Sequence, residues 1–201
     1  MEMGDFMKKK LLSVAGVTGF VAATVVLGPA TAANAAPLVC EPGYKSAKWT
    51  SVSQGWVITH AKQVSIAADS TGTYSKTATY RKTVTSGREI TTGVNYSASW
   101  VISSLDANVS GTLTRAGEKT KETSETITFN FNRPGTYAIF SGVKSVTGYY
   151  TAKTCNSRGT GWGSVGYGKG HSWSVDAEGA VKCTENPAAG TAKRAAKNGY
   201  C

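Results

Sequence analysis

Hydrophobic and polar residues alternate most cleanly between Val94 and Leu113. One face of an extended chain would carry Val94, Tyr96, Ala98, Trp100, Ile102, Ala107, Val109 and Leu113, with a break of four residues that contains Leu105. Ser, Thr and Asn dominate the opposite face. Because successive side chains of a strand point to opposite sides, this pattern predicts a β-hairpin with one apolar and one polar face. The connection at 103–106 has a length that hairpins commonly use.

Other parts of the chain also favour strands. We expect one or two strands over 49–66, strands over 74–84 and 122–131, a strand pair over 136–143 and 146–150, and a short hairpin over 173–183 that turns at 176–179. Residues 69–72 and 132–135 have the composition of turns. No segment has the periodicity of a helix of three turns. The sequence therefore predicts an all-β class with unusually long, Ser/Thr-rich strands.

Residues 157–172 combine glycine at six positions with aromatic side chains. One interpretation is an adaptable binding loop, with Trp162, Tyr167, His171 and Trp173 as its candidate contact residues. The alternative is a tight meander whose aromatic side chains pack inward. The sequence leaves both interpretations open.

The first 35 residues have the layout of a bacterial secretory signal peptide. Lys8 to Lys10 form a positive segment, 11–27 is apolar, and Ala33-Asn34-Ala35 is a small-residue cleavage site. A membrane anchor is the alternative interpretation, and translation from Met7 would give a more typical start. We expect export, cleavage after Ala35 and an extracellular location.

The four cysteines, Cys40, Cys155, Cys183 and Cys201, lie beyond that segment. An even number in an exported chain predicts two disulfides. Three pairings are possible, and we favour Cys155 with Cys183 and Cys40 with Cys201. A metal site is the weaker alternative, because there is no C-x-x-C spacing and the chain has two histidines. We expect no cofactor.

Two flanking segments differ from the expected all-β domain at 49–187. Residues 36–48 predict an extended N-terminal arm, with Pro37, Leu38, Val39 and Tyr44 as candidates for insertion into a partner. The basic tail at 188–201 is rich in Ala and Lys. It is either a short helix or disordered until Cys201 is bonded.

Catalytic chemistry finds little support in the sequence. The chain has no G-x-S-x-G, H-E-x-x-H or phosphate-loop motif. We interpret His60 and His171 as hydrogen-bonded or surface imidazoles. The net charge of +10 favours anionic surfaces outside the cell over nucleic acid, because the chain is predicted to be exported. Solubility of a Ser/Thr-rich sheet is an equally good reason for that charge.

A membrane role is compatible with the Val94–Leu113 pattern. A membrane β-strand needs about 9–11 residues with one apolar and one polar face, and each arm of the predicted hairpin has this length. The simpler alternative is an ordinary half-buried sheet, which alternates in the same way.

Four consecutive segments resemble a known family. A Ser/Thr-rich strand (Tyr74 to Val84) leads to an amphipathic hairpin (Gly93 to Thr114), a Ser/Thr/Glu strand (Glu122 to Phe129) and a Pro-Gly turn with a Tyr-bearing strand (Arg133 to Tyr137). This order is similar to the β-rich module of the aerolysin and epsilon-toxin/mosquitocidal-toxin superfamily, over about residues 56–150. The resemblance implies an elongated, twisted antiparallel sheet and an oligomeric β-barrel pore whose inserting hairpin is 94–113.

Three functions follow from these expectations. The first is a secreted, non-enzymatic, toxin-related protein that binds an anionic cell surface or other secreted proteins, as a subunit of an extracellular toxin assembly. The second is a homo-oligomeric pore former, and the third, ranked last, is a secreted hydrolase. No nucleic-acid partner is expected.

Overall fold

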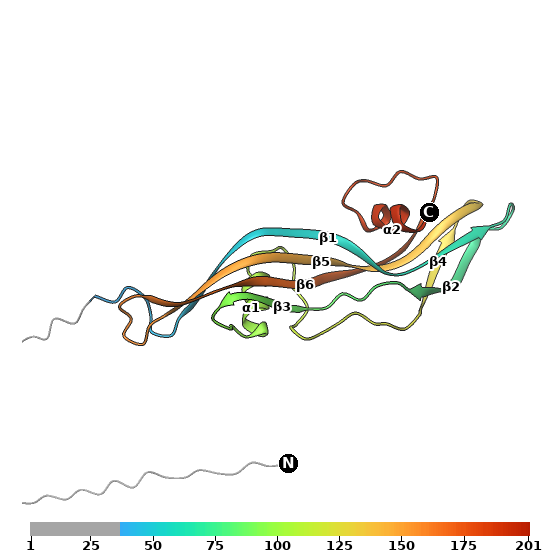
Figure 1. Ribbon diagram of the computed structural model, residues 1–201. Helices are drawn as coiled ribbons and strands as arrows, with labels where there is room; N and C mark the ends of the chain where they lie inside the picture. Colours follow the sequence, from blue (N-terminus) through green and yellow to red (C-terminus); the bar gives the residue numbers. More distant parts are fainter. Residues whose placement is uncertain (1–36) are drawn as a thin grey trace, which may run out of the picture. The chain divides into compact units, whose positions relative to one another are not determined.

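The structure, a computed structural model, describes residues 37–201, which belong to one compact unit. The predicted signal peptide lies outside the described residues. The described chain contains one antiparallel sheet of six strands in the order β3-β6-β5-β1-β2-β4 (Figure 1). Its elements are β1 (Lys45–Ile66), β2 (Gly72–Tyr80), β3 (Gly87–Gly93), α1 (Ala98–Asp106), β4 (Glu125–Phe131), β5 (Gly135–Cys155), β6 (Trp162–Lys182) and α2 (Ala192–Tyr200). The predicted all-β class is confirmed.

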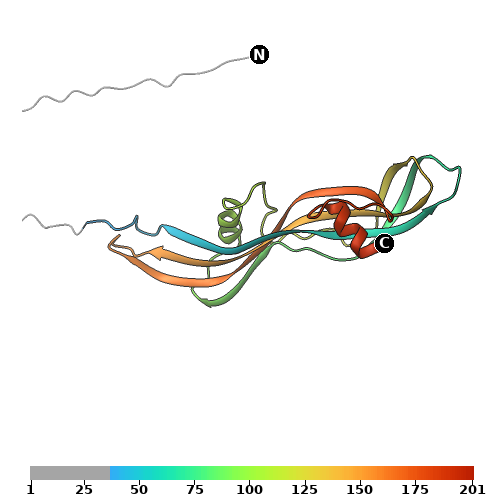
Figure 2. The same ribbon diagram turned by 90° about the horizontal axis from the view of Figure 1, so that it is seen from above.

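Three strands are much longer than the rest. β1, β5 and β6 contain 22, 21 and 21 residues, and they pair side by side along most of their length. They form the twisted centre of the sheet, as Figures 1 and 2 show. The expectation of long strands is therefore confirmed.

The predicted strand pair over 136–150 and the predicted hairpin over 173–183 are wrong, because each belongs to a single continuous strand. β5 runs without interruption through the expected break between 143 and 146, and β6 passes through the expected turn at 176–179. The physical reason is a β-bulge at Val175, where Val143 pairs with Asp176 and Lys144 pairs with Ser174. Val175 adopts a positive φ of 42°. A bulge places an extra residue in a continuing strand, so its local sequence resembles a turn.

One half of the sheet is covered on both faces. Ala196 of α2 packs with Ile58 and Phe140. Ile127 of β4 packs in a second cluster that contains Ile139. Because Ile139 and Phe140 are adjacent in one strand, they face opposite sides. The long strands are therefore sandwiched between α2 and the β2–β4 ribbon at this end.

Both disulfides form, but the favoured pairing is wrong. Cys40 bonds to Cys155, and Cys183 bonds to Cys201. Cys155 lies beside the start of β6, whereas Cys183 follows its end. A strand of this length spans roughly 70 Å, which excludes a bond between Cys155 and Cys183.

The two disulfides secure the ends of the described chain. The first fixes the arm, whose last residues, from Lys45, already belong to β1. The second returns the end of α2 to the end of β6. The tail is thus a short helix, which was one of the two alternatives.

Candidate functional site: the segment between β2 and β4

The segment that connects β2 to β4 crosses the long strands instead of forming a turn. β2 and β4 pair from Gly72↔Phe131 to Ala78↔Glu125, while β2 joins β1 at the pairs His60↔Tyr80 and Ala61↔Thr79. We call residues 81–124, which leave β2 and return to β4, the strap. It contains β3 and α1, and Figure 2 shows α1 on one side of the sheet.

Three glycines of β6 allow the strap to lie directly on the sheet backbone. A Cβ atom at Gly166 would lie 2.4 Å from the Val94 carbonyl oxygen, and one at Gly168 would lie 2.3 Å from the Glu89 carbonyl oxygen. At Gly170 it would lie 2.7 Å from the Trp49 ring. A side chain at Gly166 or Gly168 would displace the strap, and one at Gly170 would displace the Trp49 ring of β1, which packs beneath the strap. From Trp162 onward the glycine-rich segment is therefore a strand on which the strap lies, not a loop. Ligand binding by its aromatic residues stays a prediction.

The central part of the strap is helical, so the prediction of a β-hairpin at Val94–Leu113 is wrong for this structure. The side chain of Ser97 caps α1 by accepting from the backbone N–H of Trp100. Val101, Ile102 and Leu105, at helical spacing, are buried. The indole Nε1 of Trp49 donates to Ser104 Oγ at 2.9 Å. Packing against β1 and β5 thus overrides the alternation.

A buried hydroxyl pair joins both legs of the strap to β6. Ser86 Oγ donates to Ser172 Oγ at 2.8 Å, and Ser172 Oγ donates to the Thr114 carbonyl oxygen at 2.8 Å. Ser172 is fully buried. Buried polar groups that lose their partner are costly, by about 1–3 kcal/mol. These contacts therefore hold the strap at the two positions that flank β3 and α1.

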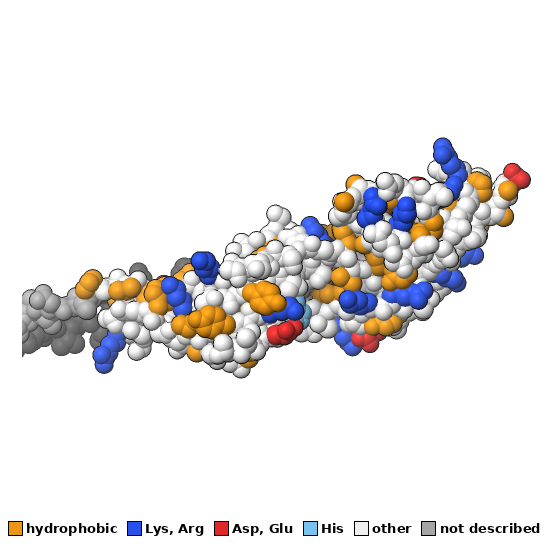
Figure 3. Space-filling view, turned by 45° about the horizontal axis from the view of Figure 1, so that its top comes forward, with side chains coloured by type: hydrophobic (Ala, Val, Ile, Leu, Met, Phe, Trp, Pro, Cys, Tyr) orange, Lys and Arg blue, Asp and Glu red, His pale blue; other side chains and the backbone are white. Residues whose placement is uncertain are grey.

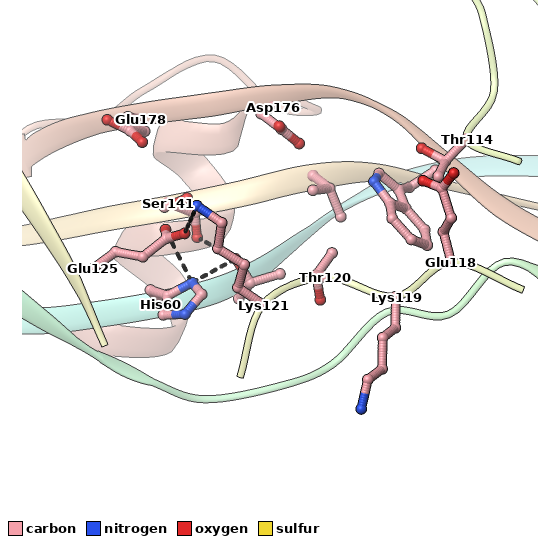
Figure 4. A pocket seen from close by; sticks show the side chains of 13 residues that line it. His60, Thr114, Glu118, Lys119, Thr120, Lys121, Glu125, Ser141, Asp176 and Glu178 are labelled. Carbon is pink, nitrogen blue, oxygen red and sulfur yellow. Dashed lines mark hydrogen bonds and ion pairs between the residues drawn. The ribbon is translucent and has the colours of Figure 1, made fainter. Parts of the chain in front are cut away.

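His60 fixes the point where the strap becomes β4 (Figure 4). The residue is 1% exposed. Nε2 lies 2.8 Å from the Thr123 carbonyl oxygen and therefore donates to it. Nδ1 lies 3.0 Å from Thr59 Oγ1 and 3.3 Å from Glu125 Oε2. The Thr59 hydroxyl in turn donates to the Ser141 carbonyl oxygen, so the imidazole is held among β1, β5 and the start of β4.

A cavity of about 390 Å³ lies next to His60, between the strap and the long strands. The strap contributes Glu118, Lys119 and Lys121, and β6 contributes Asp176 and Glu178. Figure 4 shows these side chains around the cavity. Residues 37–201 contain no group of three or more His, Cys, Asp or Glu side chains placed to hold a metal ion. The cavity is a groove under the strap whose walls carry charges of both signs.

The contact between β3 and the long strands contains buried polar atoms that lack hydrogen-bond partners within residues 37–201. Three buried side-chain atoms of the described residues have no hydrogen-bond partner: Arg88 Nε, Tyr150 Oη and His171 Nδ1. Burial raises the pKa of the Tyr150 hydroxyl, and the nearby charge of Arg88 opposes that shift. Tyr150 lies directly beneath the strap, because its hydroxyl would be 2.7 Å from a Cβ atom at Gly168.

The residues predicted for the hairpin differ in how far they are buried. Tyr96, Ile102, Leu105 and Leu113 are buried, whereas Ala98, Trp100 and Val109 are half-buried and Val94 and Ala107 are exposed. None of them lies on a strand. Six of them pack the strap onto β1 and β5: Tyr96, Trp100, Ile102, Leu105, Val109 and Leu113.

The other predicted site residues are not brought together in one site. Trp173 is buried and lines the cavity, and His171 lies 3.9 Å from Glu89. Tyr167 is exposed, and Trp162 is half-buried beneath Lys153. In the arm, exposed side chains include Pro37, Leu38, Val39 and Tyr44.

The His60–Glu125 contact and the glycine face were not predicted from the sequence. For the glycines a signal was present, because Gly166, Gly168 and Gly170 are spaced by two. That spacing indicates one face of a strand. No comparable signal connects His60 to Glu125, which are separated by the whole strap.

Comparison with known proteins gives no family assignment: no protein-family model, curated protein or solved structure matches the chain. Among residues 37–201, neither helix has the length and apolar character needed to cross a membrane.

Proposed function

We propose that the chain is a secreted, non-enzymatic, toxin-related β-protein that binds a cell surface, assembles there with copies of itself and inserts part of its strap into the membrane as a β-hairpin. One observation carries this proposal. Residues 94–113 alternate as membrane strands do, yet they fold as a helix and a loop in a segment bracketed by two strands that already pair. Conflict between local pattern and fold is expected where function requires a second conformation.

The charge distribution of the strap supports insertion. Between Ile90 and Thr114 the sequence contains a single side chain that is charged at neutral pH, Asp106. Arg88 and Glu89 precede this stretch, and Arg115 follows it. Each half has the roughly 9–11 residues that a membrane strand requires. Because β2 and β4 are antiparallel, extension of both would prolong the ribbon that they form.

Assembly follows from the open sheet. β3 and β4 lie at its two edges. An open edge cannot face lipid, since its backbone groups would have no partners there. Several copies that contribute one hairpin each would close the barrel and remove the edges.

A second candidate function is that of a subunit in an extracellular assembly with other secreted proteins. The observation that favours it is the arm, in which Leu38 and Val39 are 72% and 60% exposed. Two large apolar side chains next to the Cys40–Cys155 bond are available to a partner. In that case, removal of residues 37–39 abolishes co-purification of partners from culture fluid and leaves the sheet folded.

Two neighbouring substitutions test membrane insertion. Ala98 and Ser99 both lie in the first turn of α1, where an aspartate is favourable for a helix. In an extended hairpin they face opposite sides, so only Ala98→Asp places a charge on the lipid side. We expect wild type and Ser99→Asp to release dye from phosphatidylglycerol-containing vesicles and Ala98→Asp to release none. Equal leakage by both variants, or no leakage by the wild type, would overturn the proposal.

A further inference from the structure

The face of the long strands that points away from α1 is uncovered where β1, β5 and β6 lie closest to the arm. Trp49 and Tyr150 pack beneath the strap on the opposite face. Their sequence neighbours therefore point away from the strap. Tyr149 and Tyr167 on this free face are 52% and 45% exposed, and Figure 3 shows hydrophobic and basic side chains interspersed along the sheet. We call this surface the free face.

Two adjacent rows of the free face have the same composition. The strand register aligns Lys48 with Thr151 and Tyr167, and Thr50 with Tyr149 and Lys169. Each row thus holds one cation, one hydroxyl and one aromatic ring. Rows two residues apart are separated by roughly 7 Å along the strands.

A third row continues this arrangement toward the arm. Ser46 aligns with Lys153, and Lys153 aligns with Val165, which is 40% exposed. The Lys153 ammonium lies 4.2 Å from the centre of the Trp162 ring. Tyr44 lies edge-on to the same ring, with the ring centres 6.1 Å apart. The aromatic surface therefore extends to the base of the arm.

The free face carries a positive charge. Lys48, Lys153 and Lys169 lie on it, and the carboxylate of Glu89 lies 3.6 Å from the Lys169 ammonium. Cations aligned on a flat surface attract an extended polyanion. Exposed Tyr rings bind the apolar C–H faces of sugar rings, and their hydroxyls form hydrogen bonds with sugar hydroxyls.

We propose that the free face binds an extended anionic glycan. Its repeating cation, hydroxyl and ring match a polymer that repeats an acidic group, hydroxyls and a pyranose face. A lipid bilayer fits less well, because membrane-inserting surfaces project large apolar side chains, whereas the apolar residue between the tyrosines and the arm is Val165. The inference names the surface component for the binding step of the proposed function and rests on that step, but not on insertion.

The test measures binding of heparin, a sulfated glycan, to the full protein by titration calorimetry. Poly-L-glutamate of similar charge provides an anionic polymer without sugar rings. We expect Y149A/Y167A to weaken heparin binding about tenfold and to leave poly-L-glutamate binding unchanged. K48Q/K153Q should weaken both. The matched control K62Q/K76Q removes the same charge from exposed lysines on other parts of β1 and β2 and should change heparin affinity less than about twofold.

Three results would overturn the proposal. Equal losses in K48Q/K153Q and K62Q/K76Q would mean that net charge alone drives binding. Unchanged heparin binding by Y149A/Y167A would exclude ring contacts. Binding to phosphatidylglycerol vesicles through the same tyrosines, without heparin binding, would assign the free face to lipid. Since soluble heparin requires no membrane, these results are independent of dye release, and either proposal can fail alone.

Discussion

Nδ1 of His60 on β1 lies 3.3 Å from Oε2 of Glu125, the first residue of β4. The two residues are separated in sequence by the entire strap. The imidazole is buried, and the carboxylate side chain is 21% exposed. The same carboxylate lies 3.7 Å from Lys121, whose side chain is 77% exposed. One acidic group therefore has a buried and an exposed partner, which allows their contributions to be compared.

We predict that Glu125→Ala lowers the free energy of unfolding by about 1–3 kcal/mol, because the buried imidazole loses a charged partner. Lys121→Ala should change it by less than about 0.5 kcal/mol, since exposed ion pairs contribute little. Urea denaturation measures both. In a double-mutant cycle, the effect of Glu125→Ala should shrink in a His60→Phe background. Equal effects of the two single substitutions would contradict this assignment.

A reversible bond between the strap and β6 should control membrane activity. Glu89 and Lys169 are direct cross-strand partners whose side chains already meet, so E89C/K169C is placed to form a disulfide. We predict that the oxidised variant releases no dye from vesicles. A mild reductant that leaves wild-type leakage unchanged should restore release.

The control for this bond is S75C/T128C, which links β2 to β4 at an exposed register pair outside both the strap and the free face. It should leak as wild type does in both redox states. Leakage by the oxidised E89C/K169C protein would show that the strap does not need to leave the sheet.

Alkaline pH should weaken the fold through Tyr150. Burial raises the pKa of its hydroxyl above the ordinary value of 10.0, so above about pH 10 the unfolded chain loses a proton that the folded chain retains. The free energy of unfolding then falls as pH rises. Tyr150→Phe removes this component, and near neutral pH it should be almost neutral, because the hydroxyl has no partner among the described residues. Urea denaturation of wild type and Tyr150→Phe from pH 8 to 11 measures this component, and the same pH dependence in both proteins would contradict the prediction.

The parts of the fold that were predictable from the sequence depend on local chemistry. The turn at Asn132 to Gly135 separates β4 from β5 as expected, because Asn, Pro and Gly favour turns on their own. The strand around Trp56 and the helical tail were also consistent with local signals. The continuity of β5 and β6 was not predictable, since the bulge at Val175 is stable only when the partner strand supplies its hydrogen bonds.

The structure of the candidate site was not predictable from the sequence, because it depends on contacts between residues that are far apart in the chain. Tyr96 and Trp100 would lie on one face of a strand, and they also stack one turn apart, with ring centres 5.0 Å apart. Their spacing is therefore compatible with both a strand and a helix. The choice is made by Trp49 and Val146, which receive α1 and the adjacent loop, and by glycines more than 60 residues downstream.

In the proposed insertion, the glycine face of β6 makes release of the strap depend on protein concentration. Gly166, Gly168 and Gly170 offer no side chains of their own, so departure of the strap would leave Trp49 and Tyr150 beside bare backbone. Such a surface is costly in water and is readily covered by a second molecule. Release of the strap and self-association of the protein are then coupled. We therefore expect the rate of leakage to rise more steeply than in direct proportion to the amount of protein at the membrane.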